Sequence, residues 1–259
     1  MNEGSRSGGR SGRALVILLI TSIALGACGR GGVRGEGELL AEAAQIEKDA
    51  GEARAAASAA GGPIVYVALG DSTGVGVGAR KGGGYVARLF GRLERARPGS
   101  RLSNFCASGA ETADVLRGQL PRVAAVRPTL VTVGIGINDV THGISVEQFA
   151  ENYERIAAGL RGATDAPVVV TNVPDISTAP RVPEFMRADL RRRIALFNAA
   201  IAETAARHRF KLVDAYGMSG DVIAAHPEFF SADGFHPSDE GYEYWAKMMW
   251  PTAKEAVGE

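Results

Sequence analysis

The sequence has little of what would indicate a disulfide scaffold, a metal centre or a nucleic-acid surface. Only two cysteines, Cys28 and Cys106, occur in 259 residues, so no disulfide framework can be predicted. The histidines and cysteines lack the spacing of metal ligands. Basic and acidic residues balance at 29 each, so no polybasic surface for nucleic acid is expected. With 46% hydrophobic residues, the chain can bury the core of one α/β domain of about 190 to 200 residues.

A long apolar run is also missing, because the charge-free stretch 14–27 is shorter than the roughly 20 residues that a membrane-spanning helix needs. It follows a basic segment and precedes Cys28, which is typical of an export signal. Residues 25–28, Leu-Gly-Ala-Cys, resemble the bacterial lipobox, in which the cysteine is diacylated and becomes the mature N-terminus. A plain signal peptide with a chance cysteine is the alternative. We therefore predict a signal peptide over 1–27 and an exported protein anchored to the bacterial cell envelope, with membrane contact through lipidated Cys28.

Residues 28–62 are predicted to be a tether that carries the lipid-attachment cysteine. Its first part is rich in glycine and flexible by composition. The part over 38–60 has helix-forming residues with a thin apolar stripe formed by Leu39, Ala43, Ile46 and Ala50. This pattern fits a spacer, and a helix docked on the body is the alternative.

The body, residues 63–259, alternates apolar runs with helical patterns. Strands are expected over 63–69, 101–107, 129–135, 166–173 and 210–215. Helices are expected over 84–96, 111–126 with an interruption at Pro121, 145–160, 185–209 and 238–256. Short charge-free strands between helices predict a five-stranded parallel sheet in a three-layer, doubly wound α/β fold. In such folds, ligands bind beyond the carboxyl ends of the strands.

The segment around Ser72 matches three motifs. Residues 70–74, GDSTG, fit the nucleophile elbow of α/β-hydrolases and approach the serine loop of trypsin-like proteases, while residues 74–79 fit a dinucleotide-binding loop. The dinucleotide interpretation fails because residues 71–73 separate the first strand from the glycines. The trypsin-like interpretation fails because it requires a histidine before the serine in the chain, whereas every histidine here follows Ser72. The α/β-hydrolase elbow follows a fifth strand, whereas only one strand precedes Ser72. The serine therefore remains a candidate nucleophile without any of these scaffolds.

Polar blocks follow the other strands at the same predicted edge of the sheet. They are residues 104–110, 136–139 and, just before the last helix, 233–237. Together with the Ser72 segment, this set resembles the four blocks of the SGNH (GDSL-type) esterase and lipase family, over roughly residues 63–255. Thr73 stands where the family name has leucine. The resemblance implies a flavodoxin-like SGNH hydrolase fold.

Ser72 needs a base that removes its proton, and His236 is the candidate. Asp233 lies three residues earlier on a short loop, where its carboxylate can orient the imidazole ring and stabilise the imidazolium. The rival histidines lack such a partner or fit a loop role better; they are His142, His208 and His226. The resemblance implies an oxyanion hole formed by the N–H groups of Ser72 and Gly109 and by the side-chain amide of Asn138. We expect no metal and no cofactor.

Asp71 and Asp139 are expected to bond neighbouring loop amides. The long loop over 174–186 is expected to wall the substrate pocket, with Ile176, Val182, Phe185 and His142 as candidate substrate contacts; a surface loop is the alternative.

Two tryptophans, both near the C-terminus, offer no aromatic platform for a polysaccharide. We therefore predict a serine esterase for small or medium acyl esters of the carboxylesterase, lysophospholipase or thioesterase kind. A carbohydrate O-deacetylase or an O-acyltransferase of the cell envelope is the alternative, and no protein partner is predicted.

Overall fold

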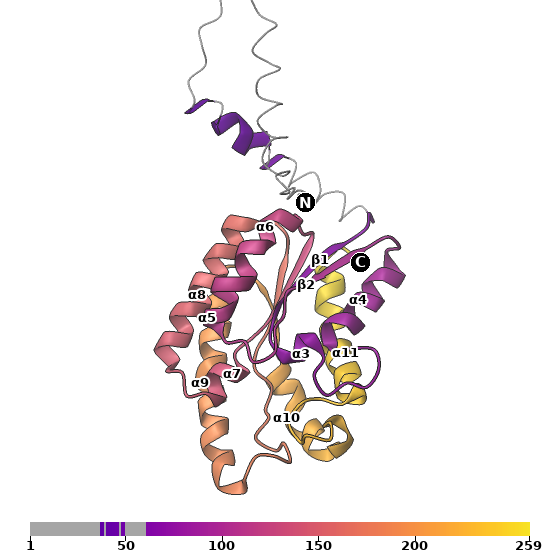
Figure 1. Ribbon diagram of the computed structural model, residues 1–259, viewed down its shortest axis with the longest axis vertical. Coiled ribbons are helices and arrows are strands. Elements are labelled where there is room, and N and C mark those ends of the chain that lie inside the picture. The colour runs from indigo at the N-terminus through magenta and orange to yellow at the C-terminus, as the bar shows by residue number, and fades with distance from the viewer. Residues whose placement is uncertain (1–36, 39, 47, 50–60) are drawn as a thin grey trace, which may run out of the picture. The chain divides into compact units, whose positions relative to one another are not determined.

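The computed structural model describes residues 37–38, 40–46, 48–49 and 61–259 (Figure 1). The predicted signal peptide, Cys28 and most of the predicted tether lie outside the described residues. Ala43 and Ile46 of the predicted stripe lie in helical residues with exposed side chains, whereas Leu39 and Ala50 are not described. Among the described helices, none has the length and apolar content to cross a membrane.

The body is built on one sheet of five parallel strands, as predicted, and the strand order is β2-β1-β3-β4-β5. The strands are β1 (Val65–Gly70), β2 (Arg101–Asn104), β3 (Leu130–Gly134), β4 (Val168–Thr171) and β5 (Lys211–Val213). The central strands β3 and β4 are buried along their whole length. Their charge-free, valine-rich sequences suit a strand that is covered on both faces.

Helices cover both faces of the sheet and complete the three layers (Figure 1). One face packs against α4 (Tyr85–Ala96) and α11 (Asp239–Ala256), and the other against α8 (Val146–Ala163) and α9 (Glu184–Arg207). Alternate β1 side chains enter opposite cores, with Val67 and Leu69 on the α8–α9 side. Every buried hydrophobic residue that the structure describes lies within residues 64–257, so residues 61–259 hold a complete core of their own.

The predicted helix over 111–126 is divided into four short segments. They are α5 (Thr112–Asp114), a π-helical turn (Val115–Gln119), a 3₁₀ turn (Leu120–Arg122) and α6 (Val123–Val126). Pro121 lies in the 3₁₀ turn, where its missing N–H prevents a regular helical bond. The interruption at Pro121 is thus confirmed, and the π-turn before it was not expected.

Four further helical segments were not predicted. They are α3 (Ser72–Val75), α7 (Ile137–Thr141), α10 (Ala215–Ala225) and the 3₁₀ turn η3 (Pro227–Phe229). Three of these have five residues or fewer, too short for a helical period to show in the sequence. The helices α3, α7 and α10 follow the carboxyl ends of β1, β3 and β5, so they lie at the edge where ligands are expected.

Candidate active site

Ser72 is placed by the tight connection between β1 and α3. Asp71 caps α3, with its Oδ1 accepting hydrogen bonds from the backbone N and the Oγ1 of Thr73, both at 2.8 Å. Ser72 is the first residue of the helix and is 6% exposed. Gly74 must be small, because a Cβ there would lie 2.3 Å from the Sγ of Cys106. The glycine-rich segment after Ser72 is therefore tightly packed at its start, and Gly76 adopts a positive φ of 100°.

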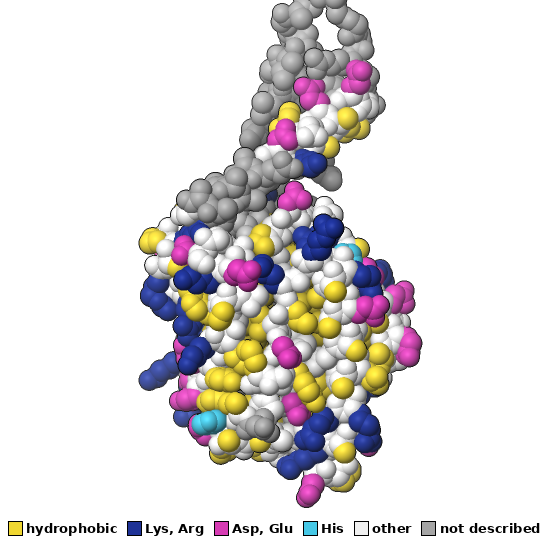
Figure 2. Space-filling view, turned by 180° about the vertical axis from the view of Figure 1, so that it is seen from behind, with side chains coloured by type: hydrophobic (Ala, Val, Ile, Leu, Met, Phe, Trp, Pro, Cys, Tyr) yellow, Lys and Arg dark blue, Asp and Glu magenta, His cyan; other side chains and the backbone are white. Residues whose placement is uncertain are grey.

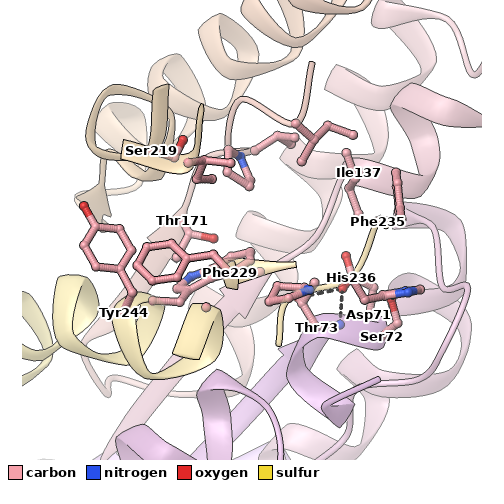
Figure 3. A pocket seen from close by; sticks show the side chains of 18 of the residues that line it. Asp71, Ser72, Thr73, Ile137, Thr171, Ser219, Phe229, Phe235, His236 and Tyr244 are labelled. Carbon is pink, nitrogen blue, oxygen red and sulfur yellow. Dashed lines mark hydrogen bonds between the residues drawn. The ribbon is translucent and has the colours of Figure 1, made fainter. Parts of the chain in front are cut away.

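His236 lies beside Ser72 at this edge of the sheet (Figure 3), and Asp233 lies on the other side of the His236 ring. The Nε2 of His236 lies 3.0 Å from the Oγ of Ser72, and its Nδ1 lies 2.6 Å from the Oδ2 of Asp233. Residues 231–236 form a turn, closed by a bond from Ser231 N to His236 O. Gly234, with a φ of 68°, supplies the left-handed residue that this turn requires. The fold therefore brings the hydroxyl, the imidazole and the carboxylate into one hydrogen-bonded row.

The second oxygen of Asp233 is held by the turn itself. Its Oδ1 accepts bonds from the backbone N–H groups of Phe235 and His236 and from the Oγ of Ser231. Burial raises the pKa of Asp233, but the bonds from the His236 ring and these donors outweigh burial and hold the pKa well below its usual value. The carboxylate is therefore charged at neutral pH and faces the imidazole as an anion.

Two of the three predicted oxyanion donors lie in short helices, Ser72 in α3 and Asn138 in α7, and the third, Gly109, lies in the loop after β2. Gly109 is exposed, has a φ of 75° and leaves open space where a side chain would stand. Asn138 in α7 donates one amide N–H to the carbonyl of Ala110, at 2.8 Å, which ties the loop after β2 to α7. Because an amide group carries two donors, the second N–H of Asn138 remains for a ligand. The backbone N–H groups of Ser72 and Gly109 donate to no atom of the described chain.

Two buried acids stand beside these residues and have structural bonds, as expected. Asp139 accepts from the backbone N and the Oγ1 of Thr112, and burial raises its pKa against those bonds. Burial also raises the pKa of Asp71 to about 6, although its bonds to Thr73 and the charge of His236 oppose the rise. Neither acid accepts a hydrogen bond from the ring of His236.

Gln119, in the π-turn, is a positioning residue that the sequence did not reveal. Its buried side chain accepts a bond from the N–H of Gly70 and donates to the carbonyl of Gly70, both at 2.8 Å. Gly70 lies two residues before Ser72, so this amide fixes the end of β1 from which the nucleophile emerges. The only signal in the sequence was a glutamine on the apolar side of an interrupted helix.

An apolar cavity of about 80 Å³ opens beside Ser72 and His236. Figure 3 shows Phe229 and Tyr244 on one side of this cavity and Ile137 and Phe235 on the other. A more open groove of about 450 Å³ runs between α7, the loop after β4 and the start of α9. Ile176 and Phe235 line both spaces, so the groove and the cavity adjoin at these two residues. In the described chain, no cluster of three or more His, Cys, Asp or Glu residues could hold a metal ion.

The predicted substrate contacts are only partly gathered around these spaces. Ile176 lines the cavity and the groove, and Val182 and Phe185 line the groove. His142 lines neither space; its Nδ1 lies 2.8 Å from Glu111 Oε1, and its contact with substrate stays a prediction. Sequence reasoning missed the cavity residues of α10 and α11, namely Ser219, Ile223, Gly241, Tyr244, Trp245 and Met248.

Comparison with known proteins indicates the family of the chain. The sequence model of the GDSL-like Lipase/Acylhydrolase family matches residues 68–244, a range that contains all the polar blocks described above. The GDSL-like esterase Rv1075c of Mycobacterium tuberculosis is 29% identical over 202 residues, which cover 74% of this chain and 62% of that protein. The chain therefore spans less than two thirds of this relative.

Two further similarities cover nearly the whole of the related chain. The esterase TesA of Pseudomonas aeruginosa is 27% identical over 187 residues, covering 72% of this chain and 86% of that protein. The crystal structure of a putative GDSL-like lipase from Parabacteroides merdae superposes with a TM-score of 0.64 and 18% identity. It covers 76% of this chain and 96% of that chain, and at this identity it supports the fold alone.

Proposed function

The chain belongs to the GDSL-like lipase/acylhydrolase family of ester hydrolases, and from that premise we propose that it is a serine esterase with Ser72, His236 and Asp233 as its triad. One observation carries the proposal: the His236 ring lies between the Ser72 hydroxyl at 3.0 Å and the Asp233 carboxylate at 2.6 Å. Both distances are within hydrogen-bonding range for a nucleophile, its base and the group that orients the base.

The proposed reaction has two halves. In the first, the Oγ of Ser72 attacks the ester carbonyl while the Nε2 of His236 takes the hydroxyl proton. Anionic Asp233 stabilises the imidazolium, which then protonates the departing alcohol and leaves an acyl group on Ser72. In the second half, the Nε2 of His236 takes a proton from water as the water oxygen attacks the acyl carbon. The bond between the acyl carbon and the Oγ of Ser72 then breaks, the carboxylic acid leaves, and the imidazolium returns its proton to the Oγ.

Charge on the carbonyl oxygen would be stabilised by the donors that carry no other bond. These are the N–H groups of Ser72 and Gly109 and the second amide hydrogen of Asn138. The bond from Asn138 to Ala110 holds the amide in place before substrate arrives, so little reorganisation is needed. Replacing Asn138 by alanine removes one donor and should lower kcat by about 10²- to 10³-fold.

The size and walls of the cavity support a short or medium acyl group. At roughly 10–15 Å³ for each water-sized group, about 80 Å³ holds some five to eight such groups. The lining is almost entirely apolar, which favours a hydrocarbon chain over a sugar. An acetyl group would fit as well, so O-deacetylation remains the second candidate. The length of the acyl chain that the enzyme hydrolyses fastest distinguishes the two candidates.

Hydrolysis of p-nitrophenyl esters of increasing chain length tests the proposal, using residues 61–259. We expect turnover to peak with short or medium chains, and Ser72→Ala to abolish it. Ser103→Ala is the matched control, because Ser103 lies on β2 and lines neither space. Full activity in Ser72→Ala would overturn the assignment, and activity confined to acetyl esters would favour the deacetylase. Added alcohol acceptors that divert product from acid to ester would indicate a transferase.

We also propose export and anchoring through Cys28, which the sequence alone supports. Metabolic labelling of the full chain with an alkyne fatty acid, with Cys28→Ala as the control, tests this. Equal labelling of the two proteins would contradict it.

A further inference from the structure

We propose that residues 181–193, here called the docking rim, seat the active-site end of the body on a bilayer that carries anionic lipids. The docking rim comprises the end of the loop after β4 and the first turns of α9. Two features of this segment carry the inference: exposed apolar side chains at its tip and an excess of arginine around them.

The apolar side chains of the docking rim are unusually open to solvent. Phe185 is 82% exposed and Met186 is 48% exposed. Within residues 61–259, the other exposed large hydrophobic side chains are Val75, Leu196 and Met218. Val75 and Met218 also lie on helices that follow the carboxyl ends of strands, so this exposure is concentrated at the end of the body that holds Ser72.

The docking rim is basic in a chain whose charges balance overall. It contains five arginines against Glu184 and Asp189, a net charge of +3, while the whole chain has none. Figure 2 shows Lys and Arg side chains beside hydrophobic ones at the end of the body where α9 begins. Among the described residues, Arg181 and Arg187 form no ion pair. The Nε of Arg187 is buried, whereas Arg181 is exposed and is the more accessible of the two to an external anion.

The dimensions and charge of the docking rim fit a lipid surface better than a protein. A stable protein interface buries about 800 Å² on each partner, whereas one aromatic side chain buries about 150–250 Å². A small apolar tip among arginines suits the boundary between headgroups and acyl chains, where aromatic residues insert and each basic residue gains about 1 kcal/mol near anionic lipid.

The docking rim also continues into the active site. Arg181, Phe185 and Met186 line the groove that shares Ile176 and Phe235 with the cavity beside Ser72. A rim seated on a bilayer would place the mouth of this groove at the lipid surface, where a membrane-borne ester can enter. Docking itself does not depend on the proposed hydrolysis, because it involves neither Ser72 nor His236.

Co-sedimentation of residues 61–259 with phosphatidylcholine vesicles, with and without phosphatidylglycerol, tests the proposal. We expect binding to the anionic vesicles that weakens with added salt. The double variant Phe185→Ser, Met186→Ser should lower the partition coefficient by about tenfold or more. The pair Arg181→Gln, Arg187→Gln should lower it about thirtyfold on anionic vesicles only.

Leu196→Ser is the matched control, because Leu196 is 57% exposed on the same helix but lies outside the docking rim. It should bind as the wild type does, and so should Ser72→Ala. Thermal unfolding shows whether each variant is folded. The proposal is wrong if the wild type binds neither vesicle, or if Leu196→Ser loses as much binding as the docking-rim variants. It is also wrong if sedimentation reveals a dimer that only the Phe185 and Met186 changes dissociate.

Discussion

Replacing Gln119 by leucine tests whether one buried amide holds the nucleophile segment in place. The side chain of Gln119 pairs with both the N–H and the carbonyl of Gly70. Leucine has nearly the same size but makes neither bond. The carbonyl of Gly70 would keep a second donor, the N–H of Ala107 at 3.1 Å, whereas the N–H of Gly70 would lose its partner.

The cost of Gln119→Leu is therefore that of one orphaned buried N–H, about 1–3 kcal/mol of the free energy of unfolding. For a body of about 200 residues this lowers Tm by about 2–12 °C. Activity should fall as well, because Gly70 sets the direction in which Ser72 leaves the sheet, and small misplacements at a reacting centre can cost about 10²-fold.

Calorimetry and p-nitrophenyl ester hydrolysis measure the two effects. Gln148→Leu is the control, since Gln148 is exposed on α8. Gln119→Glu adds a second check, because a carboxyl facing the carbonyl of Gly70 can donate only when protonated. Its folded pKa should exceed its unfolded pKa, so the variant should approach wild-type stability at low pH and lose stability as pH rises. A Gln119→Leu protein with wild-type Tm and turnover would refute the reasoning.

Three further predictions concern the same edge of the sheet. The pKa of Asp71 in the folded protein, about 6, lies above its unfolded value, so stability from its protonated form is lost as pH rises from about 4 through 6. Asp71→Asn should lack this loss, so over that pH range its free energy of unfolding, measured by urea titration, should rise by about 3 kcal/mol relative to the wild type. Plots of unfolding free energy against pH that run parallel for the two proteins would contradict this prediction. Asp233→Asn should lower kcat by about 10⁴-fold in steady-state assays, because the amide would donate to the His236 ring and hold the wrong tautomer. A loss of less than about tenfold would exclude Asp233 as the residue that orients His236. Gly74→Ala should lower the free energy of unfolding by about 1–3 kcal/mol, measured by urea denaturation, because the new Cβ clashes with the Sγ of Cys106. Adding Cys106→Ala should restore part of that stability. A Gly74→Ala protein as stable as the wild type would contradict this prediction.

The fold was predictable because its signals are local. The strands β1, β3 and β4 are short, mostly apolar runs, and α8 and α11 show a helical period long enough to recognise. The last helix begins near residue 238 as expected, where the Oγ of Ser238 caps it by accepting a bond from the N–H of Gly241. By contrast, α3 and α7 span only one turn, so nothing periodic marks them, and what starts each helix is a cap or a glycine at a strand end.

The active site was predictable only as a set of residues. The order of the polar blocks along the chain indicated Ser72, Asn138, Asp233 and His236, and the parallel topology placed them at one edge. Gln119 was missed because its partner is a backbone group 49 residues away, which no local pattern reports. The cavity residues of α11 were missed because a helix shows which face is apolar but not which part of that face lines an empty space.

The sequence by itself therefore determined the layers, the strand direction and the types of group that meet at the carboxyl edge, since periodicity and chain order depend on neighbouring residues. Only the tertiary structure decided the distances between Ser72 and His236, which are 164 residues apart, and the separation of a cavity from a groove. The physical reason is that hydrogen-bond geometry and voids arise where side chains from different elements pack together, and that packing is set by the whole fold.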